Sequence, residues 1–413
     1  MTTPVTTLSD EPTMEGVAGI VKGKLVLSQG LERTLDPTGV SGNFDRIPVI
    51  DLMPLTVENP EPEAMEKMVN DLRDACSRVG FFVIKNHGID WSIVERAFAG
   101  LKEFFALPMD AKMKVHQSQS PSYMGYEEPY YTNVDRLTKG DLKESMTIGY
   151  EPELDPEGAG LQPEVLLRQN SWPDEDSQLF KPAMREYRAA CLSLMRKLTM
   201  AMTRVMQIEE DYFVKKYTYP VAGIRGLYYP PQAPDDEDST GLGAHTDVQC
   251  AKCFSSSLVK ATTLIIPILV MTLIAQDPFD IESLEVLNAS GHWIKPKLQP
   301  QTFVVNLGDM MARLTNDVFL STVHRVRNQS GRERYSLPFF FGLNNDELIS
   351  PLPQFITSQT PIQESYKTGM TAFEHYNRRM QRAHHKHYTA TEKITTALPK
   401  GMTKIDGVLV EGL

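Results

Sequence analysis

The stretch from Gly243 to Asp277 reads GAHTDVQCAKCFSSSLVKATTLIIPILVMTLIAQD, and its two ends carry different signals. At the left end, His245 and Asp247 stand two residues apart. Residues i and i+2 of an extended strand point to the same side, so these two side chains can share one metal ion. At the right end, residues 271–277 are typical of a buried strand. Residues 251–270 between them match neither end.

A second imidazole is needed to complete such a site, and the chain has nine histidines. His324 is the candidate, because it lies in the run Ser-Thr-Val-His-Arg-Val, where a strand is expected. Two histidines and one carboxylate form the facial triad of non-haem Fe(II) oxygenases, which leaves three octahedral positions open. The alternative is that His-x-Asp occurs here by chance, as an isolated pair often does.

A carboxylate-binding group follows ten residues after His324, where Arg334 and Ser336 share one face of the next expected strand. A guanidinium binds a carboxylate through two parallel hydrogen bonds, and a neighbouring hydroxyl adds a donor. A strand arginine usually pairs with a surface acid. This one precedes Leu-Pro-Phe-Phe-Phe, a buried sequence in which an unpaired charge is costly. Phe340 in that run is a candidate for the wall of a substrate pocket, or an ordinary core aromatic.

The composition is that of a globular protein: 413 residues, 41% hydrophobic and 23% charged, with a net charge of −11. This charge argues against nucleic acid or an anionic membrane surface as a partner. Four scattered cysteines indicate a reducing compartment, and Cys250-x-x-Cys253 has no second pair to complete a zinc site. The beginning of the chain lacks the pattern of a signal peptide, and its longest apolar run falls short of a membrane span. We expect a soluble, cytoplasmic monomer.

The periodicity of the chain predicts helices followed by short strands. Helical spacing of apolar residues appears over 63–78, 91–105 and 176–206, and a polar helix is expected over 371–388. Strands are expected at 46–52 and 81–84, and long loops over 117–173. From residue 224 onward, short apolar runs separated by turn residues favour an antiparallel sandwich or barrel; these runs are 226–230, 242–248, 272–275, 284–287, 303–306, 321–326 and 335–341.

Several motifs in this order resemble the isopenicillin-N-synthase-like branch of the Fe(II)/2-oxoglutarate-dependent dioxygenases. The motifs are IPVIDL (47–52), ACSRVGFFVIKNHGI (75–89), FFALPMDAK (104–112), DLKESMTIG (141–149), LYYPP (227–231), HTD (245–247), LEVL (284–287), VNLGDMMARLTND (305–317), STVHRV (321–326) and RYS (334–336). The resemblance implies an α+β fold with a double-stranded β-helix (jelly-roll) core wrapped by helices. It also implies five parts: a loosely ordered lead-in (1–45), an N-terminal dioxygenase region (46–155), a helical spacer (156–220), the jelly-roll core (221–345) and a C-terminal helix and tail (346–413).

The resemblance also implies roles for single residues. His245, Asp247 and His324 would hold Fe(II), while Arg334 and Ser336 would bind the distal carboxylate of 2-oxoglutarate. Tyr229 would add a hydrogen bond to that carboxylate. The family often has Asn two residues before this tyrosine, and here Leu227 takes that place, which removes a polar contact near the cosubstrate.

The function implied is oxidation of a small organic molecule by Fe(II), 2-oxoglutarate and O2, with ascorbate as a candidate reductant. Hydroxylation or desaturation would accompany release of succinate and CO2, in secondary metabolism or small-molecule catabolism. One alternative is an Fe(II)-dependent oxidative cyclase that needs no 2-oxoglutarate, since such relatives keep the Arg-x-Ser pair. The other is a non-catalytic jelly-roll binding protein.

Residues 251–270 interrupt the family's pattern, in which a strand follows the His-x-Asp ligands within a few residues. Without these twenty residues the chain reads HTDVQCMTLIAQD, and the separation of His245 and His324 falls from 79 to 59 residues. We hypothesise that the block is a translated intron. A genuine surface loop is the alternative, although long structureless loops are uncommon in compact domains and an exposed apolar run favours aggregation.

Overall fold

The computed structural model describes residues 42–120, 124–132, 141–157, 170–233, 240–247, 270–344 and 347–371, together with the backbone of five short strands near the ends of the chain. These strands are β1 (Ile20–Val21), β2 (Lys24–Val26), β3 (Glu32–Thr34), β18 (Met402–Ile405) and β19 (Val408–Glu411). Most of the expected lead-in, the helix expected over 372–388, the Cys250 and Cys253 pair and residues 251–269 lie outside the described residues.

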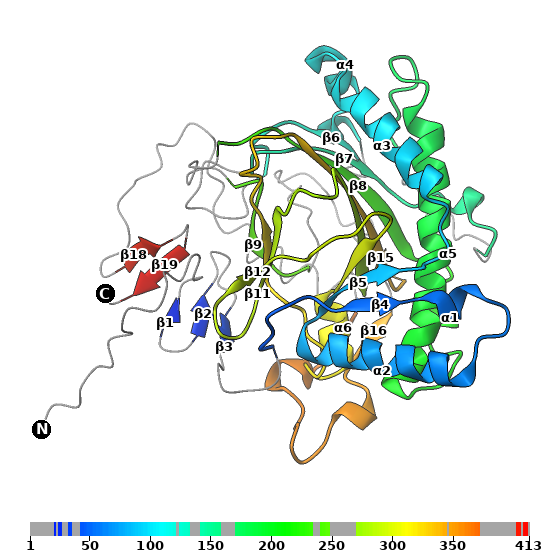
Figure 1. The fold of residues 1–413 in the computed structure, drawn as a ribbon, viewed down its shortest axis with the longest axis vertical. Helices are drawn as coiled ribbons and strands as arrows, with labels where there is room; N and C mark the ends of the chain where they lie inside the picture. The colour runs from blue at the N-terminus through cyan, green and yellow to red at the C-terminus, as the bar shows by residue number, and fades with distance from the viewer. Residues whose placement is uncertain are drawn as a thin grey trace, which may run out of the picture.

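Two β-sheets form the centre of the molecule (Figure 1). The larger sheet has the order β4-β5-β13-β10-β15-β8-β7-β6, and the smaller has the order β12-β11-β14-β9. All pairings within them are antiparallel except β4 with β5. The strands of the larger sheet are β4 (Val49–Asp51), β5 (Phe81–Lys85), β6 (Gly125–Glu127), β7 (Glu144–Ile148), β8 (Val221–Tyr229), β10 (Met271–Asp277), β13 (Phe303–Leu307) and β15 (Arg334–Gly342). Those of the smaller sheet are β9 (Leu242–His245), β11 (Leu284–Leu287), β12 (Trp293–Ile294) and β14 (His324–Val326).

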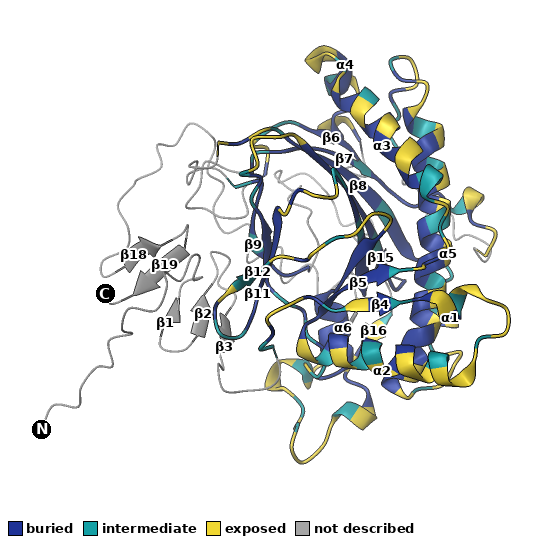
Figure 2. Cartoon of the chain, viewed as in Figure 1, coloured by how far each residue is buried: buried dark blue, intermediate teal, exposed yellow. Residues whose placement is uncertain are grey.

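Helices cover the outer face of the larger sheet, and Figure 2 shows their buried sides turned toward it. Three of them are long: α2 (Pro62–Arg78), α3 (Trp91–Phe105) and α5 (Phe180–Met206). The short elements are α1 (Met53–Thr56), α4 (Met109–Lys114), α6 (Asp309–Leu314), β16 (Leu348–Ile349) and β17 (Met370–Thr371). One hydrophobic cluster includes Leu198 of α5, Phe82 of β5 and Leu273 of β10, so the helices and the sheet share a core. The five-part division of the chain stays a prediction.

The structure confirms the jelly-roll architecture expected from the sequence, and it corrects some of the elements. The region 117–173 was expected to be long loops, but it contains β6 and β7, which extend the larger sheet beyond β8. The helix expected from residue 176 begins at Phe180, where the Ser177 hydroxyl accepts a hydrogen bond from the Phe180 amide at 3.3 Å. No helix in the described part of the chain is long and apolar enough to cross a membrane.

The two ends of the undescribed segment 248–269 lie close together. The carbonyl of Asp247 accepts a hydrogen bond from the Asp309 amide at 3.1 Å, and the carbonyl of Val270 accepts one from the neighbouring Gly308 amide at 3.1 Å. Val270 is buried, and its amide donates to the Phe341 carbonyl at 2.9 Å, which extends the pairing of β10 with β15. The chain therefore leaves and re-enters the core beside the same two amides.

Candidate metal and cosubstrate site

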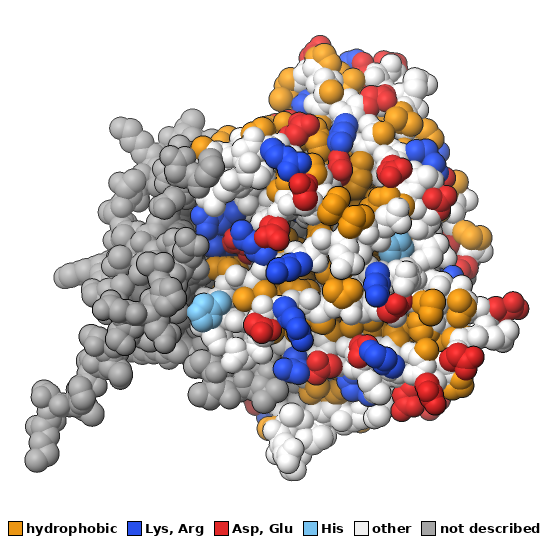
Figure 3. All heavy atoms as spheres, viewed as in Figure 1, with side chains coloured by type: hydrophobic (Ala, Val, Ile, Leu, Met, Phe, Trp, Pro, Cys, Tyr) orange, Lys and Arg blue, Asp and Glu red, His pale blue; other side chains and the backbone are white. Residues whose placement is uncertain are grey.

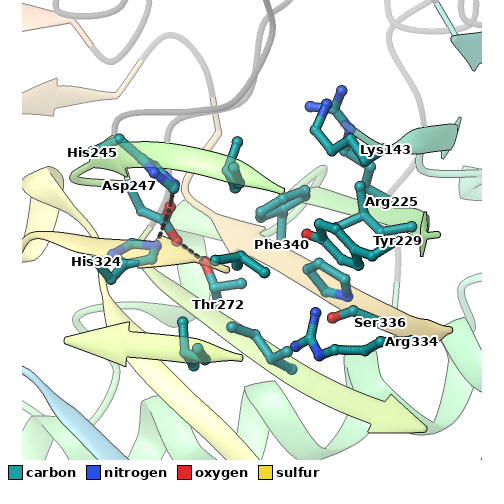
Figure 4. A pocket seen from close by; sticks show the side chains of 16 residues that line it. Lys143, Arg225, Tyr229, His245, Asp247, Thr272, His324, Arg334, Ser336 and Phe340 are labelled. Carbon is teal, nitrogen blue, oxygen red and sulfur yellow. Dashed lines mark hydrogen bonds and ion pairs between the residues drawn. The ribbon is translucent and has the colours of Figure 1, made fainter. Parts of the chain in front are cut away.

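Two strands of the smaller sheet bring the candidate metal ligands together. His245 ends β9 and is paired in register with His324, the first residue of β14, while Asp247 follows two residues after His245. Each residue offers one ligand atom, and these atoms lie within 4.8 Å of one another. Asp247 Oδ1 is 3.5 Å from His245 Nε2 and 3.4 Å from His324 Nε2 (Figure 4). Two imidazoles and one carboxylate around a common centre fit a divalent transition metal.

Hydrogen bonds orient both imidazoles toward that centre. His245 Nδ1 lies 2.8 Å from the Gly243 carbonyl, and His324 Nδ1 lies 3.1 Å from the Thr322 carbonyl. Because a carbonyl only accepts, each Nδ1 donates a proton to its carbonyl, and each Nε2 is the ring nitrogen that faces the common centre, where a metal ion would take the place of any proton on it. The ring of Phe81 meets the His324 ring edge-on, with 5.0 Å between their centroids.

Two neighbours hold the carboxylate of Asp247. Its Oδ2 accepts hydrogen bonds from the Thr272 hydroxyl and from the Asn306 amide, each at 2.7 Å, which leaves Oδ1 directed at the histidines. Burial alone would raise the pKa of Asp247, but the charge of His324 and the hydrogen bonds of both histidines outweigh it and hold the pKa well below its usual range. The carboxyl is therefore held ionised, the form that a metal requires.

A second part of the same pocket contains a buried cation. Arg334 is 1% exposed, and its Nη2 donates to Gln276 Oε1 at 2.9 Å. The Gln276 amide nitrogen is in turn held by backbone carbonyls, among them that of Ile281 at 2.9 Å. Arg334 Nε and Nη1 have no hydrogen-bond partner among the described residues, and burial lowers the pKa of this guanidinium. Two spare donors on a buried guanidinium fit the two oxygens of a carboxylate.

The pairing of β15 with β8 places Tyr229 opposite Arg334, and Ser336 lies two residues along the same strand. The guanidinium carbon of Arg334 is 5.0 Å from the centre of the Tyr229 ring. Ser336 lies opposite Leu227, and its hydroxyl donates to the Ala275 carbonyl at 3.3 Å.

The pocket brings together all seven residues that the sequence predicted for the site. They are Tyr229, His245, Asp247, His324, Arg334, Ser336 and Phe340, and Leu227 lines the pocket beside them. Phe340 is only partly buried, and its role in the wall of a substrate pocket stays a prediction. Sequence reasoning missed several polar residues around the site: Lys143, Arg225, Thr272, Gln276 and Asn306. Strand alternation could have revealed some of them, because every second residue of a strand lies on the same face. On β8 these are residues 225, 227 and 229, and on β10 they are residues 272 and 274.

Comparison with known proteins supports what this geometry indicates. Residues 47–175 match the family described as non-haem dioxygenase in morphine synthesis N-terminal, and residues 267–343 match the 2OG-Fe(II) oxygenase superfamily. The chain is 31% identical over 353 residues to the 2-oxoglutarate-Fe(II) type oxidoreductase hxnY of Emericella nidulans, covering 81% of this chain and 93% of that protein.

Solved structures show the same fold. A 2OG-Fe(II) oxygenase family protein from Caulobacter crescentus superposes with a TM-score of 0.66 at 26% identity, covering 82% of this chain and all of that one. Neurospora crassa T7H in complex with alpha-KG and 5-formyluracil superposes with a TM-score of 0.63 at 25% identity, covering 81% of this chain and 95% of that one.

A jelly-roll core with a His/Asp/His cluster and a buried arginine in one pocket defines a metal-dependent oxygenase. More specifically, the chain belongs to the Fe(II)/2-oxoglutarate-dependent dioxygenase family. The family uses Fe(II), 2-oxoglutarate and O2, and the residues described above fit both the metal and the oxo-acid.

Proposed function

We propose that His245, Asp247 and His324 hold Fe(II), and that Arg334 anchors 2-oxoglutarate for the oxidation of a small organic molecule. The observation that carries this proposal is the single pocket, in which a His/Asp/His cluster and a buried arginine with two spare donors face the same space. The metal position has oriented ligand atoms, and the arginine position has unmet hydrogen-bonding capacity. One end of the pocket is thus suited to a metal ion, and the other end is suited to a carboxylate.

The bound iron and 2-oxoglutarate supply a two-electron oxidation, in which O2 is consumed, the oxo-acid becomes succinate and CO2, and a C–H bond of the substrate is hydroxylated or desaturated. The chain contributes positioning and exclusion of water. Arg334, Ser336 and Tyr229 orient the distal carboxylate of 2-oxoglutarate, and Thr272 and Asn306 keep the Asp247 carboxylate in place. Apolar neighbours such as Leu227 and Ile274 limit the access of water to the pocket.

The small-molecule assignment draws on the relatives. The Neurospora crassa T7H structure contains alpha-KG together with 5-formyluracil, so one protein of this fold holds an oxo-acid and a small organic compound at once. The naming of relatives as 2-oxoglutarate-Fe(II) oxidoreductases favours 2-oxoglutarate over the cyclase alternative. Secondary metabolism and small-molecule catabolism both stay open as settings, with ascorbate as a candidate reductant.

We also propose that the protein acts as a cytoplasmic monomer, without nucleic acid or a membrane surface as its partner. The net charge of −11 argues against anionic partners such as nucleic acid or a membrane surface, and the face shown in Figure 3 carries acidic and basic side chains interspersed rather than one basic field. Light scattering on the purified protein would measure its mass, and a dimeric mass would contradict the monomer.

The test compares His324→Ala with His292→Ala after anaerobic loading with Fe(II). His292 is exposed and lies outside the pocket, so it is a matched histidine control. We expect His324→Ala to lose iron and succinate formation from 2-oxoglutarate by more than the roughly 10–100-fold that loss of a supporting hydrogen bond costs. His292→Ala should behave as wild type. Wild-type iron content and succinate yield in His324→Ala would refute the ligand set.

A further inference from the structure

The pocket has a second cationic side that the proposed chemistry does not use. Lys143, directly before β7, and Arg225, on β8, line the same pocket as the metal and cosubstrate residues. Figure 4 shows both side chains on the side of Tyr229 away from Arg334. The proposed function gives these two side chains no part in holding iron or 2-oxoglutarate.

The order of strands separates Lys143 from the cosubstrate arginine. β8 lies between β15 and β7, with Tyr229 opposite Arg334 and Tyr228 opposite Glu144. Lys143 therefore lies beside Tyr229, two strands away from Arg334. Neighbouring strands are about 4.8 Å apart, so roughly 10 Å separates the backbones of the two cations. The tyrosine ring stands between them, so a molecule at Lys143 occupies a different part of the pocket from the distal carboxylate of 2-oxoglutarate.

Within the described residues, Lys143 uses only one of the three hydrogen-bond donors of its ammonium. The side chain is 3% exposed, and its ammonium donates one hydrogen bond, to the Thr132 hydroxyl at 2.7 Å. Among the described residues, the nearest carboxylate oxygen is Asp141 Oδ2, which forms an ion pair with this ammonium at 3.9 Å, beyond hydrogen-bonding distance. An ammonium has three donors, and Lys143 makes no other hydrogen bond within the described ranges. Burying a cation with spare donors is costly unless a ligand accepts from them.

The neighbouring charged groups are better matched. Asp141 accepts from the Thr132 hydroxyl at 2.7 Å and from the Gly243 amide at 3.2 Å. Arg225 contacts Glu127 directly, and its Nη2 also donates to the Ser145 hydroxyl at 3.1 Å. Glu127 therefore compensates the charge of Arg225, while Asp141 is the ion-pair partner of Lys143 at 3.9 Å. Despite this ion pair, Lys143 keeps two spare hydrogen-bond donors on this side of the pocket within the described residues.

We propose that Lys143 binds a carboxylate of the substrate, so that the enzyme oxidises a small organic acid. This inference rests on the proposed function, because it places a substrate beside the iron and 2-oxoglutarate. A carboxylate would accept charge-assisted hydrogen bonds from the two spare donors of the ammonium. With its acid group held at Lys143, the rest of the molecule extends toward Phe340 and the His/Asp/His cluster, which line the same pocket.

The test uses protein loaded with Mn(II) and saturating 2-oxoglutarate, so that the Arg334 position is filled. Ligand-observed NMR then measures binding of matched pairs: benzoate with benzamide, phenylacetate with phenylacetamide, and cyclohexanecarboxylate with its amide. Paramagnetic broadening by Mn(II) identifies the molecules that bind near the metal. The pairs differ only in the charge of the group that Lys143 is proposed to bind.

We expect the acids to bind at least tenfold more tightly than their amides, and Lys143→Met to abolish this preference. Lys143→Arg should keep the preference, and 2-oxoglutarate affinity should stay within twofold of wild type in both variants. Lys112→Met, at a buried lysine that pairs with Glu144 outside the pocket, is the matched control. If Lys143→Met does not fold, Thr132→Val, which removes the hydroxyl that holds the ammonium, should weaken acid binding severalfold.

Several results would overturn the inference. These are equal binding of acids and amides, binding of neither, a preference that survives Lys143→Met, or an equal loss of 2-oxoglutarate affinity in that variant. An unchanged acid affinity in Thr132→Val would do the same. Failure of the proposed function is distinguishable, because the wild type would then bind no 2-oxoglutarate, and the acid preference would be measured on protein holding Mn(II) alone.

Discussion

Two arginines on the jelly-roll strands show how environment decides the role of a residue. Arg325 on β14 is buried, but its Nε donates to Glu285 at 2.6 Å and its guanidinium carbon lies 4.0 Å from the centre of the Trp293 ring. Arg334 on β15 is more deeply buried and has Gln276 as its hydrogen-bond acceptor within the described chain. Arg325 is a satisfied structural cation, whereas Arg334 is arranged for an anionic ligand.

Replacing Arg334 with Lys tests the carboxylate fork. Lysine keeps the charge but cannot make two parallel hydrogen bonds. We expect the KM for 2-oxoglutarate to rise at least tenfold, which corresponds to about 1.4 kcal/mol, with iron content unchanged. Arg325→Lys is the matched control and should leave this KM as it is. A wild-type KM in Arg334→Lys would show that the guanidinium does not bind 2-oxoglutarate.

A second prediction concerns the hydrogen bond from the Thr272 hydroxyl to Asp247. Thr272→Val keeps the shape of the side chain and deletes its hydrogen bond to Asp247, which frees the carboxylate to rotate. We expect iron affinity to fall by about 10–100-fold, measured by metal titration. Thr199→Val, at an equally buried threonine whose hydroxyl bonds the Met195 carbonyl on α5, should not change it. Equal affinities in the two variants would contradict the supporting role.

Among the elements, β9 and β10 flank the block that interrupts the family pattern. The carbonyls of Asp247 and Val270 accept from consecutive amides, which places them within roughly 10 Å of each other. Three residues, 248–250, are long enough to join Asp247 to Met271 across that distance. The match to the oxygenase superfamily also begins only at residue 267, beyond the first two candidate ligands. Both observations support the translated-intron hypothesis.

Deletion of residues 251–270 tests this hypothesis at the protein level. We expect the shortened protein to fold, to bind iron as tightly as the full chain and to unfold at a temperature no lower, because each candidate ligand and its supporting side chains remain and Cys250 can take the place of Val270 in the backbone pairing. Circular dichroism and iron titration measure these properties. An unfolded or iron-free deletion protein would show that the block is integral, and transcripts that mostly encode it would end the intron idea.

Sequence reasoning predicted the long helices and most core strands but missed β6 and β7. The helices were recognisable because apolar residues recur at helical spacing over 15 residues or more. β6 and β7 are three and five residues long, and they bury charged residues, Glu127 and Glu144 among them. Such residues usually indicate loops. Here, buried partners such as Lys112 for Glu144 and Arg225 for Glu127 compensate the charges, and no local pattern reveals those partners.

In the molecule as a whole, the site combines residues that are distant in sequence. The motifs around His245, His324 and Arg334 could be read locally, so the sequence predicted which residues meet in the pocket. Thr272 and Asn306 lie on neighbouring strands of the other sheet, paired in register with each other, and their approach to Asp247 depends on how the two sheets face. Local sequence patterns contain no information about that approach.

Ligand binding should stabilise the whole fold, because the pocket spans both sheets. A ligand at one hundred times its Kd adds about 2.7 kcal/mol to the free energy of unfolding. We expect Mn(II) to raise the unfolding temperature, and 2-oxoglutarate to raise it further in wild type but not in Arg334→Met. Differential scanning calorimetry without O2 measures both steps. An oxo-acid shift of equal size in the variant would contradict the assigned anchor.

The pairing of β5 with β13 connects the early part of the chain to the candidate metal centre. Asn306 lies opposite Phe81, whose ring contacts that of His324. Gly80, at φ +73°, allows this approach, since a Cβ there would lie 2.3 Å from the Leu320 carbonyl oxygen. Chimeras that take residues 75–89 from one relative and residues 303–326 from another should therefore lose activity, because these two segments pack against each other. Laboratory recombination of these enzymes would do well to keep residues 75–89 and 303–326 from a single parent.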